Sequence, residues 1–146
     1  MITVPVWAQP LAVEPRCTVQ ITDVYTARSA ENGQRPPLSG QWKTVTLPHE
    51  WSWRLTDPVD DVWYRIEWRQ DCVAGVQESV ALLLRSIVMA GEVYINDHFL
   101  WRDKQLVEPL SRSFNMPRYW LLPNTWIKEG TNTVWIRAVG IKHQSV

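Results

Sequence analysis

The clearest pattern along the chain is an alternation of apolar and polar residues with a period of two. It is regular over residues 62–70, VWYRIEWRQ, and again over residues 132–140, NTVWIRAVG. One face of the first segment carries Val62, Tyr64, Ile66 and Trp68, and the other carries Trp63, Arg65, Glu67 and Arg69. Such alternation is typical of β-strands that place one face in a core and leave the other wetter. Both segments are therefore predicted to be strands.

Trp63 and Trp135 point away from the predicted core faces of these two strands. They are expected either to meet on the outside of one sheet or to form a surface for a partner. An exposed apolar patch of this kind marks an interface. A homodimer formed through an exposed, tryptophan-bearing face is therefore one prediction from the sequence.

The other strand signals are shorter. They cover residues 17–27, 42–48, 79–87 and 91–101. Residues 79–87, SVALLLRSI, are apolar on both faces up to Arg85, which predicts a central strand. Residues 91–101, GEVYINDHFLW, carry the turn-forming pair Asn96-Asp97 between two apolar runs, so a tight hairpin is expected.

Turn-forming residues separate these signals, and helical periods are scarce. Residues 103–123 hold three prolines and no regular period, which predicts a long crossing loop with a short strand near Ser113–Asn115. About eight short strands with little helix indicate an all-β sandwich. A single domain over residues 1–146 is expected, excised from a longer protein. Its parts are an extended N-terminal segment (1–16), the sandwich (17–140) and a tail (141–146).

Composition is that of an ordinary globular protein. Apolar residues make up 45% of the chain and charged residues 21%, which argues against disorder. The 15 Lys and Arg residues balance the 15 Asp and Glu residues, so there is no electrostatic footprint for nucleic acid or an anionic membrane. No apolar run approaches the ~20 residues that span a bilayer, and the N-terminus lacks a signal-peptide pattern. Membrane attachment is expected only through segments outside this chain.

Tryptophan and cysteine are the informative rare residues. There are 10 tryptophans beside 2 phenylalanines; most are expected in the core, with roughly two to four partly exposed. Cys17 and Cys72 lie far apart and form no CxxC spacing, which disfavours a metal or redox site. A disulfide between them would fit an oxidising compartment, and two buried thiols would fit a cytosolic one. The sequence leaves that choice open.

Catalytic motifs are not found. The histidines His49, His98 and His143 have no metal-ligand spacing, and no GxSxG, HExxH or P-loop pattern occurs. A non-enzymatic domain without a cofactor is therefore expected.

One cluster of acidic residues has the composition of a cation site. Asp57, Asp60 and Asp61 follow Glu50 closely in the sequence. Several loop oxygens of this kind can hold a structural calcium ion. The alternative is an acidic loop that is simply solvated.

Several short motifs occur in a characteristic order between residues 42 and 140. They are W-x-x-V-x-L-P-x-x-W from Trp42 to Trp51, then VWYR, VALLL, VYIND and EGTNTVWIRAV. This order resembles the galactose-binding-domain-like jelly roll, notably the N-terminal sugar-binding domain of family 2 glycoside hydrolases. The resemblance implies a jelly-roll β-sandwich. Asp97 stands where that family usually has glycine, and Asn115-Met116-Pro117 replaces its acidic, threonine-bearing segment.

The layout is also similar to the extracytoplasmic sensor domains of bacterial histidine kinases and diguanylate cyclases. The similarity is carried by SRSFNMPRYWLLP (111–123) and VWIRAV (134–139). It implies a non-catalytic, periplasmic sensor domain of an inner-membrane signalling protein that recognises a carbohydrate or another small polar ligand. The alternatives are an accessory domain of a glycoside hydrolase and a carbohydrate-binding module of a secreted enzyme.

Aromatic residues lie near arginines in and around the predicted crossing loop. Aromatic faces beside guanidinium groups suit a sugar ring or a carboxylate, by stacking and by bidentate hydrogen bonds. The candidate ligand-binding residues are Trp53, Trp101, Arg112, Asn115, Arg118 and Trp120. In the alternative interpretation, Trp120 pins the loop onto the sandwich together with Leu121 and Leu122, and the arginines lie in water.

Overall fold

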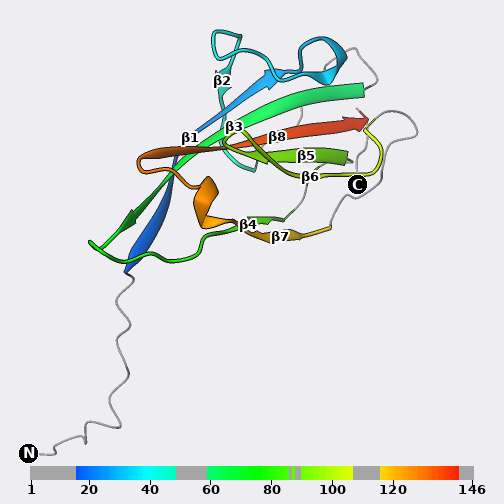
Figure 1. The fold of residues 1–146 in the computed structure, drawn as a ribbon. Coiled ribbons are helices and arrows are strands. Elements are labelled where there is room, and N and C mark those ends of the chain that lie inside the picture. The colour runs from blue at the N-terminus through cyan, green and yellow to red at the C-terminus, as the bar shows by residue number, and fades with distance from the viewer. Residues whose placement is uncertain (1–15, 49–58, 86, 88–89, 107–115, 142–146) are drawn as a thin grey trace, which may run out of the picture.

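In a computed structural model, the described part of the chain forms eight β-strands and two short 3-10 turns (Figure 1). The structure describes residues 16–48, 59–85, 87, 90–106 and 116–141. The strands are β1 (Cys17–Arg28), β2 (Lys43–Thr44), β3 (Val59–Cys72), β4 (Ala81–Leu84), β5 (Ala90–Ile95), β6 (His98–Arg102), β7 (Arg118–Leu121) and β8 (Thr131–Ile141). The turns are η2 (Glu31–Gly33) and η3 (Asn124–Trp126), and no described helix is long or apolar enough to cross a membrane. The predicted all-β fold is confirmed.

The strands form two antiparallel sheets. The larger sheet has the order β2-β1-β3-β8-β5-β6, and β4 pairs with β7 in the smaller one. Figure 1 shows β4 and β7 as a separate layer below the larger sheet. This arrangement is compatible with a jelly-roll sandwich.

The core lies between the two sheets and is built from alternate residues of the long strands. Val62, Tyr64, Ile66 and Trp68 of β3 all belong to it, as the alternation predicts. Their neighbours in the sheet are Val93 and Ile95 of β5 and Val134, Ile136 and Ala138 of β8. Val93 and Ile95 have no exposed surface. Burial of these apolar side chains is the main force that holds the two layers together.

The position of β4 differs from the prediction of a central strand over residues 79–87. Among the described residues, β4 is four residues long and pairs with β7 alone. Leu82 and Leu84 pack against the core, whereas Leu83 is 58% exposed. An apolar run indicates burial on both faces only if both faces are covered, and here one face of β4 is open.

The predicted hairpin at Asn96-Asp97 is present and joins β5 to β6. Asn96 has a φ of 52°, in the left-handed region that asparagine tolerates better than most residues. Its backbone N–H donates to the Thr133 carbonyl of β8 at 2.8 Å, and its side-chain amide donates to the Trp126 carbonyl of η3 at 2.7 Å. The turn is therefore fixed to β8 as well as closed by its own chemistry.

A disulfide joins Cys17 and Cys72. The two residues are cross-strand partners at the start of β1 and the end of β3. Of the two cysteine states that the sequence leaves open, the structure holds the bonded one. The bond closes the end of the ribbon formed by β1 and β3.

Candidate functional site

Three of the predicted ligand-binding residues come together where β6 faces β7. The rings of Trp101 and Trp120 have centroids 5.7 Å apart, and the guanidinium of Arg118 lies 4.9 Å from the Trp101 ring centroid. Trp101 and Trp120 are half-buried. Trp53, Arg112 and Asn115 lie outside the described residues. We call Trp101, Arg118 and Trp120 the inter-sheet cluster.

The charge of the inter-sheet cluster is directed into the protein. Arg118 is 5% exposed; its Nη1 donates to the Met116 carbonyl at 3.0 Å and its Nη2 lies 3.3 Å from Asp103 Oδ2. A guanidinium held in this way braces the two sheets. Ligand binding by the inter-sheet cluster stays a prediction.

The acidic group proposed as a calcium site is only partly described. Asp57 lies outside the described residues, and of Asp60 only its backbone position on β3 is described. The carboxylate of Asp61 accepts hydrogen bonds from both Ser29 and Arg137. No group of three acidic, histidine or cysteine side chains among the described residues is arranged to hold a metal ion.

Of the two predictions for Trp63 and Trp135, the one that gives them an exposed, partner-facing surface is wrong. Trp63 is 3% exposed and Trp135 is 7% exposed. The segment between β1 and β2 folds back over them: the Trp63 Nε1–H donates to the Gly33 carbonyl at 3.0 Å, and Trp42 packs on Trp135 at 5.7 Å. Around Trp63 and Trp135, both faces of β3 and β8 are therefore covered.

A groove lies beside this covering segment on the outer face of the large sheet, opposite the core. Its volume is about 670 Å³, within the range of small-molecule sites. The floor is a single cross-strand row that runs Trp63, Arg137, Glu92 and Arg102 across β3, β8, β5 and β6. The rims carry Asn32, Gly33, Gln34 and Arg35 on one side and Lys104 and Leu106 on the other. We call this the outer groove.

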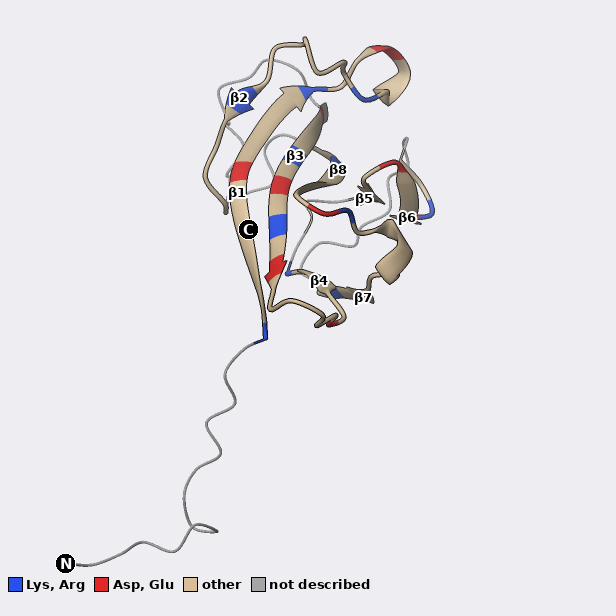
Figure 2. Cartoon of the chain, turned by 60° about the vertical axis from the view of Figure 1, so that its left-hand side comes forward, with Lys and Arg blue, Asp and Glu red and all other residues tan. Residues whose placement is uncertain are grey.

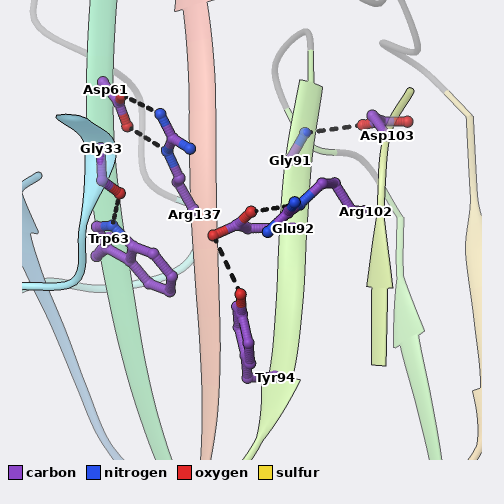
Figure 3. Close-up of polar contacts among 9 residues, drawn as sticks. All are labelled: Gly33, Asp61, Trp63, Gly91, Glu92, Tyr94, Arg102, Asp103 and Arg137. Atoms are coloured by element: carbon purple, nitrogen blue, oxygen red, sulfur yellow. Dashed lines mark hydrogen bonds and ion pairs between the residues drawn. The ribbon is translucent and has the colours of Figure 1, made fainter. Parts of the chain in front are cut away.

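Hydrogen bonds fix the charged groups of the floor (Figure 3). Glu92 is 4% exposed and accepts from Arg102 Nε at 2.7 Å and from the Tyr94 hydroxyl at 3.5 Å. Arg137 donates from Nε and Nη2 to the two oxygens of Asp61, at 2.9 and 2.7 Å. The result is a charged surface that is already organised before any ligand enters, which lowers the cost of binding.

Both guanidinium groups of the floor are stabilised in their charged form. The Glu92 carboxylate raises the pKa of Arg102 above its usual value. The hydrogen bonds to Asp61 raise the pKa of Arg137, against the lowering effect of burial. Four cationic side chains line the groove, namely Arg35, Arg102, Lys104 and Arg137. The acidic residues near these four cations are Glu92 and Asp97 in the groove and Asp61 behind Arg137. The formal charge of the groove region is therefore +1.

Sequence reasoning missed the outer groove, whose residues leave only a weak signal. Glu92 and Arg137 are charged residues inside regular strands, at positions opposite the core face. Their pairing depends on β5 lying beside β8, although the two residues are far apart in the sequence. Charged residues are ordinary on the solvated face of an antiparallel sheet, so these two positions do not predict a groove until the strand order is known.

The position of Gly33 leads to a test of the rim. Its φ is +75°, and a Cβ built there would lie 1.9 Å from Arg137 Nη2. We expect Gly33→Ala to displace the Arg137 guanidinium from Asp61, and to lower the free energy of unfolding by about 2–3 kcal/mol, the sum of backbone strain and a disturbed ion pair. Chemical denaturation measures this loss.

Gly130→Ala is the matched control for Gly33→Ala. Gly130 has a φ of +83° and open space where its Cβ would lie. The control carries the backbone strain alone, about 1–2 kcal/mol. Equal losses in the two variants would contradict the close contact between Gly33 and Arg137.

Comparison of the chain with protein-family models and with curated protein sequences finds no match.

Proposed function

We propose that this chain is a non-catalytic ligand-binding sandwich domain, and that the outer groove binds a small polar ligand such as a carbohydrate. The observation that carries this proposal is the buried Glu92 carboxylate at the centre of the groove floor, held between Arg102 and Tyr94. A buried carboxylate needs several hydrogen-bond donors, and it can accept about four. Hydroxyl groups of a sugar are suitable donors for the positions that remain.

The excess positive charge of the outer groove favours ligands that carry a carboxylate. Arg102, at the end of the groove floor, has 51% of its side-chain surface exposed, and Lys104 lies exposed on the adjacent rim. On the opposite rim, Arg35 stacks on Trp135, with its Cζ 4.1 Å from the ring centroid. A uronic acid offers hydroxyl groups to Glu92 and a carboxylate to these cations, so it is the sugar class that fits best.

The wider role that we propose is sensing outside the cytoplasm, in a bacterial transmembrane signalling protein. The Cys17–Cys72 disulfide supports this placement, because disulfides persist in oxidising compartments. Ligand binding would signal only if the ligand had different affinities for two states of the attached protein. Resemblance to the galactose-binding-domain-like jelly roll supports only the sandwich fold that this proposal assumes.

An accessory domain of a glycoside hydrolase is the second candidate. The outer face of the β4–β7 sheet exposes Leu83, Tyr119 and Leu121, at 58%, 67% and 62%. Cross-strand pairing of Leu83 with Tyr119 and of Ala81 with Leu121 makes these residues one surface. A neighbouring domain that packed there would bury an apolar patch.

Titration of tryptophan fluorescence and of the melting temperature tests the proposed ligand site. The panel contains neutral sugars, uronic acids and small carboxylates. A uronic acid is expected to produce a saturable change and to raise the melting temperature. Arg102→Gln is expected to weaken binding about tenfold, the loss of one charge-assisted hydrogen bond.

The control is Arg69→Gln, in a residue with nearly the same exposure as Arg102. The side chain of Arg69 is 49% exposed and pairs with Asp71, away from the outer groove. Binding should be unchanged in this variant. Binding that is lost in Trp101→Ala and kept in Arg102→Gln would move the site to the inter-sheet cluster, and a flat response to the whole panel would contradict the proposal.

A further inference from the structure

Among the described residues, the outer edge of β1 has no partner strand over the first part of β1. β2 pairs with Tyr25 and Thr26 only. Between Cys17 and Asp23, the described residues provide β1 with a partner on one side alone, which is β3. A strand edge of this kind presents unpaired backbone donors and acceptors to any other strand.

This edge has few of the features that normally prevent strands from pairing. The sequence contains no charged residue and no proline between Arg16 and Asp23, and in Figure 2 the corresponding lower part of β1 is tan throughout. Val19 and Ile21 are 55% and 57% exposed, and they share the face of the strand that carries Trp68 on β3. Natural edge strands are usually protected by charge, proline or an early bulge. β1 does have one bulge, at Thr22, which is the last residue of the uncharged segment; the register with β3 is regular from Cys17 to Ile21.

The open segment is complementary to itself. It reads Thr-Val-Gln-Ile-Thr from Thr18 to Thr22. In an antiparallel pair centred on Gln20, threonine faces threonine, valine faces isoleucine and Gln20 faces its own copy. Aliphatic and Thr–Thr pairs of this kind stabilise antiparallel sheets. Two-fold symmetry requires an interface in which each partner presents the same surface, and this register satisfies that requirement.

We propose that a second copy of this chain pairs with residues 18–22 of β1, edge to edge, in the antiparallel register centred on Gln20. The two six-stranded sheets then become continuous. Val19 and Ile21 of both copies form an apolar group on one face, next to the two Trp68 side chains. The contact is smaller than a standard interface, so the dimer is weak as an isolated domain and becomes strong when two chains are tethered together.

A charge-swap experiment at Gln20 tests both the dimer and its register. Gln20 is exposed, so charged residues are tolerated there. Gln20→Lys and Gln20→Glu each place like charges opposite each other, and each is expected to weaken self-association about fivefold. An equimolar mixture of the two variants brings opposite charges together and is expected to restore dimers. Sedimentation velocity measures the three samples and the unmodified chain over a concentration series.

Melting curves accompany the charge-swap experiment, because Gln20 lies opposite Arg69 on β3. A lysine there adds a repulsion within one chain, and the melting temperature reports it separately. The proposal is overturned if the unmodified chain stays monomeric up to about 1 mM, the range of the weakest specific complexes. It is also overturned if both variants dimerise as well as the unmodified chain, or if mixing them restores nothing.

Discussion

Asn132→Ala is expected to lower the free energy of unfolding by about 3–4 kcal/mol, because several buried hydrogen bonds end on this one side chain. Asn132 has no exposed surface. Its Oδ1 accepts from the Lys128 backbone N–H at 2.7 Å and from Asn96 Nδ2 at 3.0 Å, and its Nδ2 donates to the Lys128 carbonyl at 2.9 Å. Alanine would leave the buried Asn96 Nδ2 without this acceptor and the half-buried N–H and carbonyl of Lys128 without their side-chain partner.

The loss is large because the network connects three parts of the fold. Asn96 belongs to the β5–β6 turn; its amide donates to the Trp126 carbonyl of η3 at 2.7 Å and accepts from the Thr133 N–H of β8 at 2.9 Å. Asn132 therefore holds the hairpin turn, η3 and the start of β8 together. Hydrogen bonds in such a network strengthen one another in a low dielectric. Urea denaturation followed by circular dichroism measures the change.

Asn124→Ala is the matched control for this variant. Asn124 is exposed at the start of η3, and the substitution is chemically the same. A loss within about 0.5 kcal/mol is expected there. A loss below about 1 kcal/mol for Asn132→Ala would mean that water replaces the amide, and that the network does not fix the turn.

The alternation of residues predicts the long strands because their core faces are determined locally. In β3 every second residue enters the core, and the turn at Asn96-Asp97 follows from its own chemistry. The residues that cover the second face of a strand come from distant parts of the sequence. Trp63 is covered by the segment that contains Gly33, 30 residues earlier, and its Nε1–H donates to the Gly33 carbonyl. The alternation of residues within β3 cannot predict this contact.

The same reasoning explains which parts of the candidate sites could be predicted. Trp101, Arg118 and Trp120 do lie together, since they flank one connection between β6 and β7, which are consecutive in the sequence. The outer groove instead requires a row across four strands, which depends on strand order. The acidic run in the sequence gives no sign that the Asp61 carboxylate bonds to Ser29 and Arg137, because those partners come from distant parts of the chain. A run of acidic residues is therefore weak evidence for a cation site.

Asp103→Ala is expected to lower the free energy of unfolding by about 3–5 kcal/mol, because it removes one partner of a buried ion pair. The side chains of Asp103 and Arg118 are 5% and 4% exposed. Asp103 Oδ2 accepts from the Gly91 N–H at 2.8 Å and lies 3.3 Å from Arg118 Nη2. Alanine would leave a buried N–H of β5 and a buried guanidinium of β7 without this carboxylate.

Asp71→Ala removes the same group from an exposed pair and serves as the control. Asp71 lies 3.8 Å from Arg69, with the two side chains 64% and 49% exposed, so a loss below about 1 kcal/mol is expected. Adding Arg118→Met to Asp103→Ala should recover part of the larger loss, because the buried charge that Asp103 compensates is then gone as well. Strictly additive losses in the double variant would contradict the ion pair as a coupled unit.

The location of the Asp103–Arg118 pair gives this measurement a bearing on function. Asp103 directly follows β6 and Arg118 begins β7, so the pair ties together the two ends of the connection that contains Arg112 and Asn115. If Asp103→Ala also changed ligand affinity, that connection would contribute to binding. If it reduced stability and left affinity unchanged, the pair would act only between the sheets, and the outer groove would bind independently of it.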